Sequence, residues 1–309
     1  MKIVVTGGAG FIGSHIVEHW HNQGAEVHVI DNLRSGFFSN IEPFKNVIFH
    51  KASITDHDSV FKILKNTDFV FHLAAFVSVP ESIEKPEECN EININGLLNV
   101  LGACKEFGVR KIVFSSSAAI YGDNPKSPKT VDMKPAPKSP YGSTKLEGED
   151  YLSMYNQKFG LGTVSLRYFN VFGPRQDPKS QYSAAIPIFV SKAIRHEPIT
   201  IYGDGEQTRD FIFVKDVVSA NVLAADNEKA NGVFNVATGS AISINDIVRL
   251  VIDETKSKSK IIYEKERAGD IKHSLASVAD TQKELNFVPE YHFEDGMRKT
   301  IKYFMKQMK

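Results

Sequence analysis

The sequence predicts an α/β fold: a doubly wound parallel sheet with helices on both faces, joined to a smaller, loop-rich α/β domain. Three observations support this prediction. Short strands rich in valine, isoleucine and phenylalanine alternate with amphipathic helices through the first half of the chain. A glycine-rich turn joins the first predicted strand to the first predicted helix. After about residue 170 the pattern becomes irregular and loops predominate.

The predicted elements follow one another in a regular order. Strands are predicted at 2–7, 26–31, 46–54, 68–75 and 110–119, with a further apolar segment at 162–173, and helices at 11–24, 56–66, 93–108 and 143–159. The strands are almost continuous apolar runs, which indicates burial on both faces of the sheet. We expect a first domain at 1–169, a segment at about 208–240 that returns to its sheet, and a second domain at 170–309.

Bulk composition excludes several classes of protein. The 309 residues include 37 basic and 37 acidic side chains, a balance that argues against a general binder of nucleic acid or of membrane surfaces. The two cysteines, Cys89 and Cys104, form no CxxC motif, so neither a metal site nor a disulfide framework is expected. No apolar run approaches the roughly 18 residues of a transmembrane helix, and no signal peptide is evident. We expect a cytoplasmic protein.

The segment TGGAGFIG contains Gly7, Gly10 and Gly13 at intervals of three. Glycine allows a tight turn and close approach of a ligand to the backbone, and free N–H groups at a helix N-terminus bind a pyrophosphate. Asp31 ends the second strand, where a carboxylate bonds adenosine ribose hydroxyls and repels a 2′-phosphate. The pattern predicts a dinucleotide site that prefers NAD to NADP, with Arg34 as a nearby cation that could meet a phosphate.

Tyr141 and Lys145 are the strongest catalytic candidates. They stand in YGSTK, after the proline-rich loop 123–140 and at the start of a predicted helix. A spacing of four places both on one helical face. A neighbouring ammonium and a positive nicotinamide ring both favour the phenolate. We therefore expect the pKa of Tyr141 to fall from about 10 towards neutrality, where the residue works as a general base.

Taken together, TGGAGFIG, HLAA, FSSSAAIYG and YGSTK resemble the extended short-chain dehydrogenase/reductases, and within them the sugar-nucleotide 4-epimerases that act on UDP-glucose or UDP-N-acetylglucosamine. LRYFNVFGPRQ, YGDGEQTRDFIFVKDV and RAGD extend the resemblance through the second half of the chain. The resemblance implies a Rossmann sheet, tightly held NAD, and inversion of a UDP-sugar at C4 through a transient 4-keto sugar.

The resemblance also implies which residues hold the cofactor. The pyrophosphate would contact Gly7, Gly10, Phe11, Ile12 and Gly13. The adenosine ribose would contact Asp31, Asn32, Arg34, Ser35 and Gly36, and adenine would lie beside Ser53 and Ile54. The cleft and its nicotinamide end would be lined by Leu73, Ala74, Ala75, Ser115, Tyr168 and Val171, with Tyr141 and Lys145. The family usually carries an acidic residue at the position of Ser53, and this departure weakens the expected adenine contact.

Ser117 completes the implied catalytic set. It stands at the end of a predicted strand, and by resemblance it hydrogen-bonds the sugar hydroxyl that gives its proton to Tyr141. Hydride leaves C4 and returns to the other face of the sugar. Ala118 and Ala119 follow Ser117, where related 4,6-dehydratases carry an acidic pair, so elimination of water lacks its acid and base.

The implied substrate contacts lie mostly in the second domain. Besides Ser117 and Tyr141 they are Ser78, Asn170, Thr200, Tyr202, Arg209, Arg267, Asp270 and Ser274. The arginines suit a diphosphate, because a guanidinium matches phosphate oxygens. Ser274 stands where relatives restricted to plain hexoses carry a large side chain, which leaves room for a 2-acetamido group. We therefore expect UDP-N-acetylglucosamine and UDP-N-acetylgalactosamine as substrates, with UDP-glucose as well.

The sequence also leaves open two alternative functions and a homodimeric assembly. A UDP-glucuronate 4-epimerase or decarboxylase would need a cation for the sugar carboxylate, and Arg175 could supply it. A non-catalytic NAD-sensing module would have no need of the Tyr141–Lys145 pair. Apolar residues on helices 93–108 and 143–159 predict either core packing or a homodimer; they are Leu97, Val100, Leu101, Leu152 and Tyr155.

Overall fold

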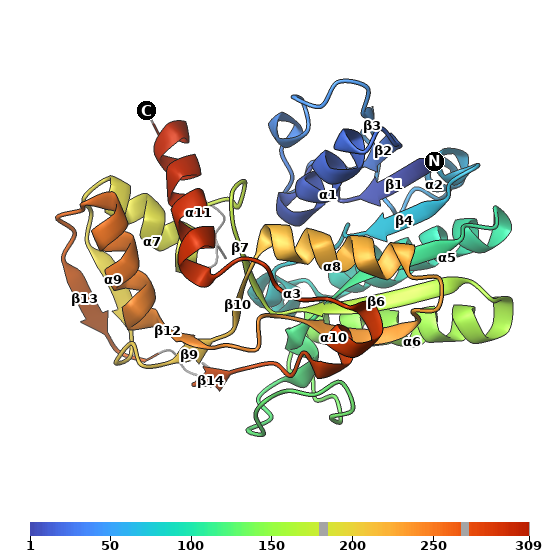
Figure 1. The fold of residues 1–309 in the computed structure, drawn as a ribbon. Coiled ribbons are helices and arrows are strands. Elements are labelled where there is room, and N and C mark those ends of the chain that lie inside the picture. The colour runs from blue at the N-terminus through green and yellow to red at the C-terminus, as the bar shows by residue number, and fades with distance from the viewer. Residues whose placement is uncertain (179–184, 267–271, 309) are drawn as a thin grey trace.

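The described residues, 1–178, 185–266 and 272–308, form a large lobe built on a seven-stranded parallel sheet and a smaller lobe beside it in this computed structural model (Figure 1). The strand order is β11-β6-β5-β4-β1-β2-β3. The sheet strands are β1 (Lys2–Thr6), β2 (Glu26–Ile30), β3 (Ile48–His50), β4 (Phe69–His72), β5 (Lys111–Ser117), β6 (Gly162–Tyr168) and β11 (Gly232–Val236). Successive strands run outward from β1 to β3 and then resume at β4 on the other side of β1. Such a switch point is where open α/β sheets bind ligands.

Helices cover both faces of the sheet, as the sequence predicted. On one face lie α1 (Phe11–Asn22) and α8 (Val214–Asp226), with α10 (Ala279–Leu285) against α8. On the other lie α2 (His57–Leu64), α5 (Gly96–Glu106) and α6 (Pro140–Phe159). Short helices connect these elements: η1 (Phe38–Asn40), α3 (Val79–Glu84), α4 (Pro86–Asn90), the π-helical turn η2 (Glu91–Asn95) and η3 (Ala118–Tyr121).

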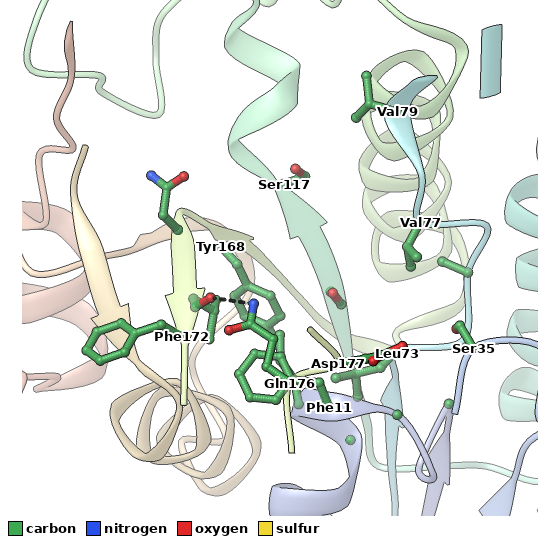
Figure 2. A pocket seen from close by; sticks show the side chains of 18 of the residues that line it. Phe11, Ser35, Leu73, Val77, Val79, Ser117, Tyr168, Phe172, Gln176 and Asp177 are labelled. Atoms are coloured by element: carbon green, nitrogen blue, oxygen red, sulfur yellow. Dashed lines mark hydrogen bonds between the residues drawn. The ribbon is translucent and has the colours of Figure 1, made fainter. Parts of the chain in front are cut away.

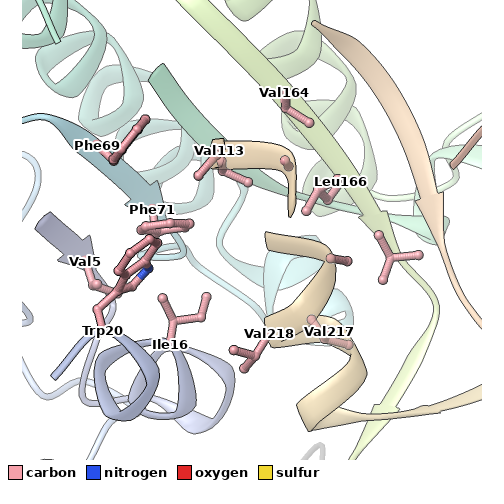
Figure 3. Close-up of a cluster of buried hydrophobic side chains, with 14 of the residues drawn as sticks. Val5, Ile16, Trp20, Phe69, Phe71, Val113, Val164, Leu166, Val217 and Val218 are labelled. Atoms are coloured by element: carbon pink, nitrogen blue, oxygen red, sulfur yellow. The ribbon is translucent and has the colours of Figure 1, made fainter. Parts of the chain in front are cut away.

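Alternation of side chains along each strand builds two separate cores. Val5 and Phe71 project to the α1 and α8 face, where they pack with Trp20 (Figure 3). Val4 and Val70 project to the opposite face and pack with α2 and α5. Successive side chains point to opposite faces, so both sets are apolar and the strands read as continuous apolar runs. Each such buried side chain contributes about 1.5–3 kcal/mol.

The apolar residues on α5 and α6 belong to this second core. Leu97, Val100, Leu101 and Leu152 are at most 1% exposed, and Tyr155 packs against the same cluster. Their apolar character therefore follows from packing within one chain. The outer surface of α6 still carries Met154 and Phe159, which are about half exposed.

The segment 162–173 forms two strands rather than one. β6 ends at Tyr168, where the Phe169 N–H donates to the Val236 carbonyl, and β7 (Asn170–Phe172) then pairs with β10 (Phe211–Phe213) outside the main sheet. The chain thus leaves the sheet within one residue and enters the smaller lobe. The strand β11, which lies inside segment 208–240, pairs with β6 in the main sheet.

The smaller lobe packs helices around short strands. Three helices pack against one another and share a core with β8 (Ile199–Tyr202) and β10; they are α7 (Ala185–Ile194), α9 (Ile244–Thr255) and α11 (Phe293–Gln307). Strand β8 pairs with β13 (Ile261–Glu264). A separate small sheet has the order β12 (Ile242–Ser243), β9 (Thr208–Arg209) and β14 (His273–Ser274). Cys89 and Cys104 are buried and free. Among the described residues, no helix is both long and apolar enough to span a bilayer.

Candidate active site

A cleft of about 1210 Å³ opens at the carboxyl ends of β1, β4, β5 and β6 and extends to the smaller lobe (Figure 2). One wall begins at the glycine turn after β1, and the opposite wall includes residues of β7, β8 and β9. This is the edge at which the sheet order reverses, and such edges hold ligands in this class of fold. Most of the site residues predicted from the sequence meet here.

The glycine turn packs so closely against neighbouring backbone that it has no space for a side chain at Gly7 or Gly13. Gly7 has φ of 70°, and a Cβ there would lie 2.6 Å from the Ala74 nitrogen; a Cβ on Gly13 would lie 2.2 Å from the Gly7 carbonyl oxygen. Helix α1 follows Gly10 with no side-chain cap and no acidic residue in its first turn. Its first N–H groups and the positive end of its dipole therefore suit an anion, which fits the pyrophosphate of NAD.

Asp31 is held rigidly at the end of β2. Its carboxylate oxygens accept hydrogen bonds from the Ala9 N–H at 3.0 Å and the Leu33 N–H at 2.8 Å. Burial raises the pKa of Asp31, and these backbone hydrogen bonds oppose the rise. The carboxylate lines the cleft in a fixed orientation, so it can accept hydrogen bonds from ribose hydroxyls.

Arg34 lines the same part of the cleft but is already engaged. Its guanidinium pairs with Glu81 at 3.0 Å and with Glu88, and it stacks over the Phe76 ring. A 2′-phosphate would need positive charge from Arg34, but two carboxylates already neutralise the guanidinium. Arg34 is therefore poorly placed to favour NADP.

The other predicted cofactor residues also line the cleft, apart from Lys145, which lies behind Tyr141. They are Phe11, Ile12, Asn32, Ser35, Gly36, Ser53, Ile54, Leu73, Ala75, Ser115, Tyr168 and Val171. Ser53 has its hydroxyl 2.8 Å from the Thr55 hydroxyl. Its hydroxyl also accepts from the Thr55 N–H at 3.2 Å, so the side chain organises the local turn.

Helix α6 positions Tyr141 and Lys145. The Ser139 hydroxyl accepts from the Gly142 N–H, and Pro140 occupies the first helical turn, so the helix begins directly before Tyr141. One turn later Lys145 is 3% exposed, and its ammonium donates to the Ser115 carbonyl at 2.7 Å. The ammonium lies 5.7 Å from the centre of the Tyr141 ring.

Burial dominates the titration of both residues. It raises the pKa of Tyr141, against a hydrogen bond from Ser117 that lowers it, and it lowers the pKa of Lys145 to about 8. For the chain alone, the direction for Tyr141 is opposite to the sequence prediction, which counted the positive nicotinamide ring together with Lys145. The reason is that burial removes the hydration that a phenolate needs, while the Lys145 ammonium is directed at the Ser115 carbonyl.

Ser117 joins the pair from the neighbouring strand. It is the last residue of β5, its hydroxyl accepts from the Ala119 N–H at 3.1 Å, and its side chain lies near enough to the Tyr141 phenol to lower the pKa of that phenol. Ser115 lies two residues earlier on the same strand and holds Lys145 through its carbonyl. One strand end therefore fixes both partners of the tyrosine.

The predicted substrate residues divide into three groups. Asn170, Thr200, Tyr202 and Arg209 line the cleft. Ser78 instead caps α3 by accepting from the Glu81 N–H, and Ser274 lies beside Arg209 on β14, neither being part of the cleft lining. Arg267 and Asp270 lie outside the described residues.

Two glutamines in the lining were missed as site residues. Gln176, labelled in Figure 2, donates to the Val171 carbonyl at 3.3 Å. Gln207 donates to the Tyr202 carbonyl at 2.8 Å. In each, the buried amide oxygen has no hydrogen-bond partner among the described residues. An unpaired buried acceptor costs about 1–3 kcal/mol, so these two oxygens fit donors on a bound ligand. In the sequence, the only indication of a role for these glutamines was their position within the motifs GPRQ and GEQTRDF.

Arg175 lies next to Gln176 but points away from the cleft. Its guanidinium pairs with Glu18 of α1 at 2.5 Å and donates to the Ser14 hydroxyl at 3.3 Å. Lys215 also pairs with Glu18, at 3.2 Å. Arg175 therefore ties its loop to α1 and is not placed to receive a sugar carboxylate.

Known proteins resemble the chain over its whole length. The NAD dependent epimerase/dehydratase family matches residues 3–237. A UDP-N-acetylglucosamine 4-epimerase from Methanobrevibacter ruminantium, solved with UDP-N-acetylmuramic acid, superposes with a TM-score of 0.95 at 45% identity and covers 99% of both chains. A Thermus thermophilus UDP-glucose 4-epimerase in complex with NAD gives 0.89 at 37%, covering 98% of this chain and 99% of that one. A putative UDP-glucose 4-epimerase of Methanocaldococcus jannaschii is 37% identical over 97% of both chains.

Proposed function

The chain belongs to the NAD-dependent epimerase/dehydratase family, and on that premise we propose that it inverts UDP-sugars at C4. The observation that carries the proposal is that Ser117 and Tyr141 line the same cleft as the glycine turn and Asp31, with the Lys145 ammonium directly behind Tyr141. Such a set has a proton acceptor, a hydrogen-bonding partner and a cation next to a dinucleotide site, and a passive sensor of NAD requires none of the three.

The cofactor would be held by the turn at Gly7 to Gly13 and by Asp31. When bound, NAD would supply a hydride acceptor and a positively charged ring. One cleft holds both the dinucleotide residues and the substrate residues, so the chain keeps cofactor and sugar together throughout the reaction. The net redox change is then zero.

The chain's own residues handle the proton. Once ionised, the Tyr141 phenolate would take the proton of the 4-hydroxyl and return it after inversion, and the Ser117 hydroxyl would hold that sugar oxygen beside the phenolate. The Lys145 cation favours the phenolate while it remains protonated, which holds below its pKa of about 8. No carboxylate follows Ser117 in η3, since Ala118 and Ala119 stand there, which argues for epimerisation over dehydration.

We assign UDP-N-acetylglucosamine and UDP-N-acetylgalactosamine as substrates, with UDP-glucose and UDP-galactose as further ones. Support comes from the 45% identity to a UDP-N-acetylglucosamine 4-epimerase over nearly the whole chain and from the unpaired amide oxygen of Gln176 in the lining. The diphosphate would lie against Arg209, and the uridine against Thr200 and Tyr202. Ser274 pairs with Arg209 between β14 and β9 and does not line the cleft, so its small side chain would affect the bound sugar only through β9.

UDP-glucuronate is the competing substrate. It needs a cation at the sugar carboxylate, and the residue expected to supply it, Arg175, is occupied by Glu18 on the α1 side of its loop. This placement favours neutral hexoses.

We also propose that the protein works as a cytoplasmic homodimer. Its two cysteines are free thiols, as is usual in a reducing compartment. The half-exposed Met154 and Phe159 on the outer side of α6 provide apolar surface for a second copy. Light scattering of the purified protein measures this directly, and a monomer at micromolar concentration would contradict it.

A substrate panel tests the function. The purified protein is incubated with UDP-N-acetylglucosamine, UDP-glucose and UDP-glucuronate in separate reactions, and the C4 epimer ratio is read by proton NMR. We expect both neutral sugars to reach equilibrium with their epimers and UDP-glucuronate to remain unchanged. Turnover of UDP-glucuronate alone, with or without carbon dioxide release, would contradict the assignment.

A further inference from the structure

Asp210 is a buried carboxylate behind the substrate half of the cleft, between Arg209 and Phe211 of the cleft lining, and the catalytic chemistry does not use it. It is 0% exposed. Four groups donate to its carboxylate: the Thr238 N–H at 2.8 Å, the Thr238 hydroxyl at 2.7 Å, the Gly239 N–H at 3.0 Å and the Ala276 N–H at 3.3 Å. A carboxylate that accepts several backbone N–H groups is a rigid anchor, because losing it leaves several buried donors unpaired.

The backbone of Asp210 holds two further segments. Its carbonyl accepts from both the backbone N–H of Asn170, at 3.2 Å, and the side-chain amide of Asn170, at 3.1 Å. Its own N–H donates to the Ser274 carbonyl at 2.9 Å. Arg209 precedes it directly and faces Ser274 in the β9–β14 pairing.

The backbone of Asp210 thus joins three segments that each carry a residue expected to serve the UDP-sugar. Its carboxylate fixes this backbone in place by binding Ala276, two residues after Ser274, and the loop at Thr238 and Gly239. Asn170 begins β7, Arg209 ends β9 and Ser274 ends β14. They come from parts of the chain separated by dozens of residues, and the only covalent neighbour of Asp210 among them is Arg209. The NAD half of the cleft, by contrast, is built on β1, β2 and α1 and shares no hydrogen bond with this carboxylate among the described residues.

We propose that Asp210 is a positioning residue that sets the geometry of the UDP-sugar half of the cleft without contacting the ligand. This inference rests on the proposed function, since it assumes that a UDP-sugar binds here. It predicts that loss of the anchor weakens binding of the uridine diphosphate moiety and leaves NAD binding unchanged.

The test variant is Asp210→Asn. An asparagine keeps the shape, but its amide nitrogen would face the Gly239 and Ala276 N–H groups, donor against donor, or else the two Thr238 donors. The matched control is Asp216→Asn. Asp216 is another buried carboxylate, 1% exposed, that accepts from the Glu290 and Tyr291 N–H groups away from the cleft lining.

Calorimetric titration of the NAD-loaded proteins with UDP supplies the decisive readout, together with NAD content and the KM and kcat for UDP-N-acetylglucosamine. We expect Asp210→Asn to raise the Kd for UDP and the KM at least tenfold, with NAD content unchanged and kcat within about threefold. Asp216→Asn should lower the melting temperature and leave the Kd for UDP within twofold of wild type.

Equal UDP affinity in Asp210→Asn and wild type, or an equal loss in both variants, would overturn the inference. If Asp210→Asn does not fold, Thr238→Val removes the hydroxyl bond to the carboxylate, together with the contacts of that hydroxyl to the Ser240 backbone, and should raise the Kd for UDP severalfold; an unchanged Kd would overturn the inference equally. A wild-type protein that binds NAD but no UDP would overturn the proposed function itself, an outcome that the wild-type titration separates from the others.

Discussion

Substituting Gly7 by alanine, with Gly24→Ala as its matched control, tests whether the glycine turn depends on close packing against the backbone of Leu73 and Ala74. Both glycines have left-handed backbone, with φ of 70° and 74°. An alanine in that conformation costs about 1–2 kcal/mol at either position. At Gly24 a new Cβ would meet nothing within 4 Å, whereas at Gly7 it would lie 2.6 Å from the Ala74 nitrogen and 2.8 Å from the Leu73 carbonyl carbon.

The difference between the two variants therefore isolates the steric term. The atoms that a Cβ on Gly7 would meet are backbone, and the Ala74 N–H is itself bonded to the Thr6 hydroxyl at 3.2 Å, so the turn must move instead. Overpacking of this kind costs a further 1–3 kcal/mol, roughly. Because the displaced turn also forms the pyrophosphate site, we expect Gly7→Ala to lose NAD binding as well as stability.

Bound nucleotide, released by heat and measured by chromatography, is the assay, with melting temperature recorded alongside. We expect Gly24→Ala to retain the NAD content of wild type and to melt a few degrees lower, since about 1 kcal/mol corresponds to roughly 2–4 °C in a domain of this size class. Gly7→Ala should contain little NAD and gain no thermal stability when NAD is added. If the two variants carried equal amounts of NAD, the steric reasoning would be refuted.

Three further predictions follow from the buried charges. Burial raises the pKa of Tyr141, and the residue must lose its own proton before it can accept one from the sugar, so wild-type rates should rise with pH through the neutral range; Lys145→Met lacks the cation that favours the phenolate, so it should be slower and its rise should lie at higher pH, as measured by a pH–rate profile. Asp31→Asn should reduce the preference for NAD over NADP by roughly tenfold, about the strength of one charged hydrogen bond, as measured by nucleotide competition. Glu149→Gln should destabilise by about 3–5 kcal/mol in urea unfolding, because Arg167 pairs with Glu149 at 2.7 Å and both side chains are only 4% exposed; unchanged stability would show that the pair contributes nothing.

The local features of the site could be predicted from the sequence because their geometry depends on short spacings. The intervals between glycines, the end of a strand at Asp31 and the four-residue step from Tyr141 to Lys145 fix their own arrangement through the turn or helix that contains them. A parallel sheet then brings the strand ends to one edge, and Ser117 meets Tyr141 there.

Features that depend on distant residues could not be predicted. Arg175 was interpreted as a candidate for a sugar carboxylate, and only the fold shows that Glu18, more than 150 residues earlier, pairs with it. The titration of Tyr141 is another example: the adjacent lysine was visible in the sequence, but the burial that outweighs it was not.

The same limit applies to the helices of the predicted dimer. Apolar residues around α5 are consistent with either a subunit interface or a helix packed between neighbours, and periodicity alone does not separate these cases. In the structure α5 packs against both α2 and α6, so Leu97 and Val100 are fully buried within one chain. The division of segment 162–173 into β6 and β7 could not be predicted for a related reason. The residues that hold the two parts, Val236 and Asp210, lie far along the sequence.

The central claim is that the phenol of Tyr141 exchanges a proton with the sugar while the cleft retains the cofactor. The most direct test compares wild type with Tyr141→Phe on UDP-N-acetylglucosamine, measuring the rate of C4 inversion and the NAD bound per chain. We predict that Tyr141→Phe loses at least 100-fold in rate, the usual scale of positioned acid–base catalysis, and retains full NAD. Inversion at the wild-type rate by Tyr141→Phe, or a wild-type protein that inverts none of the UDP-sugars, would contradict the account.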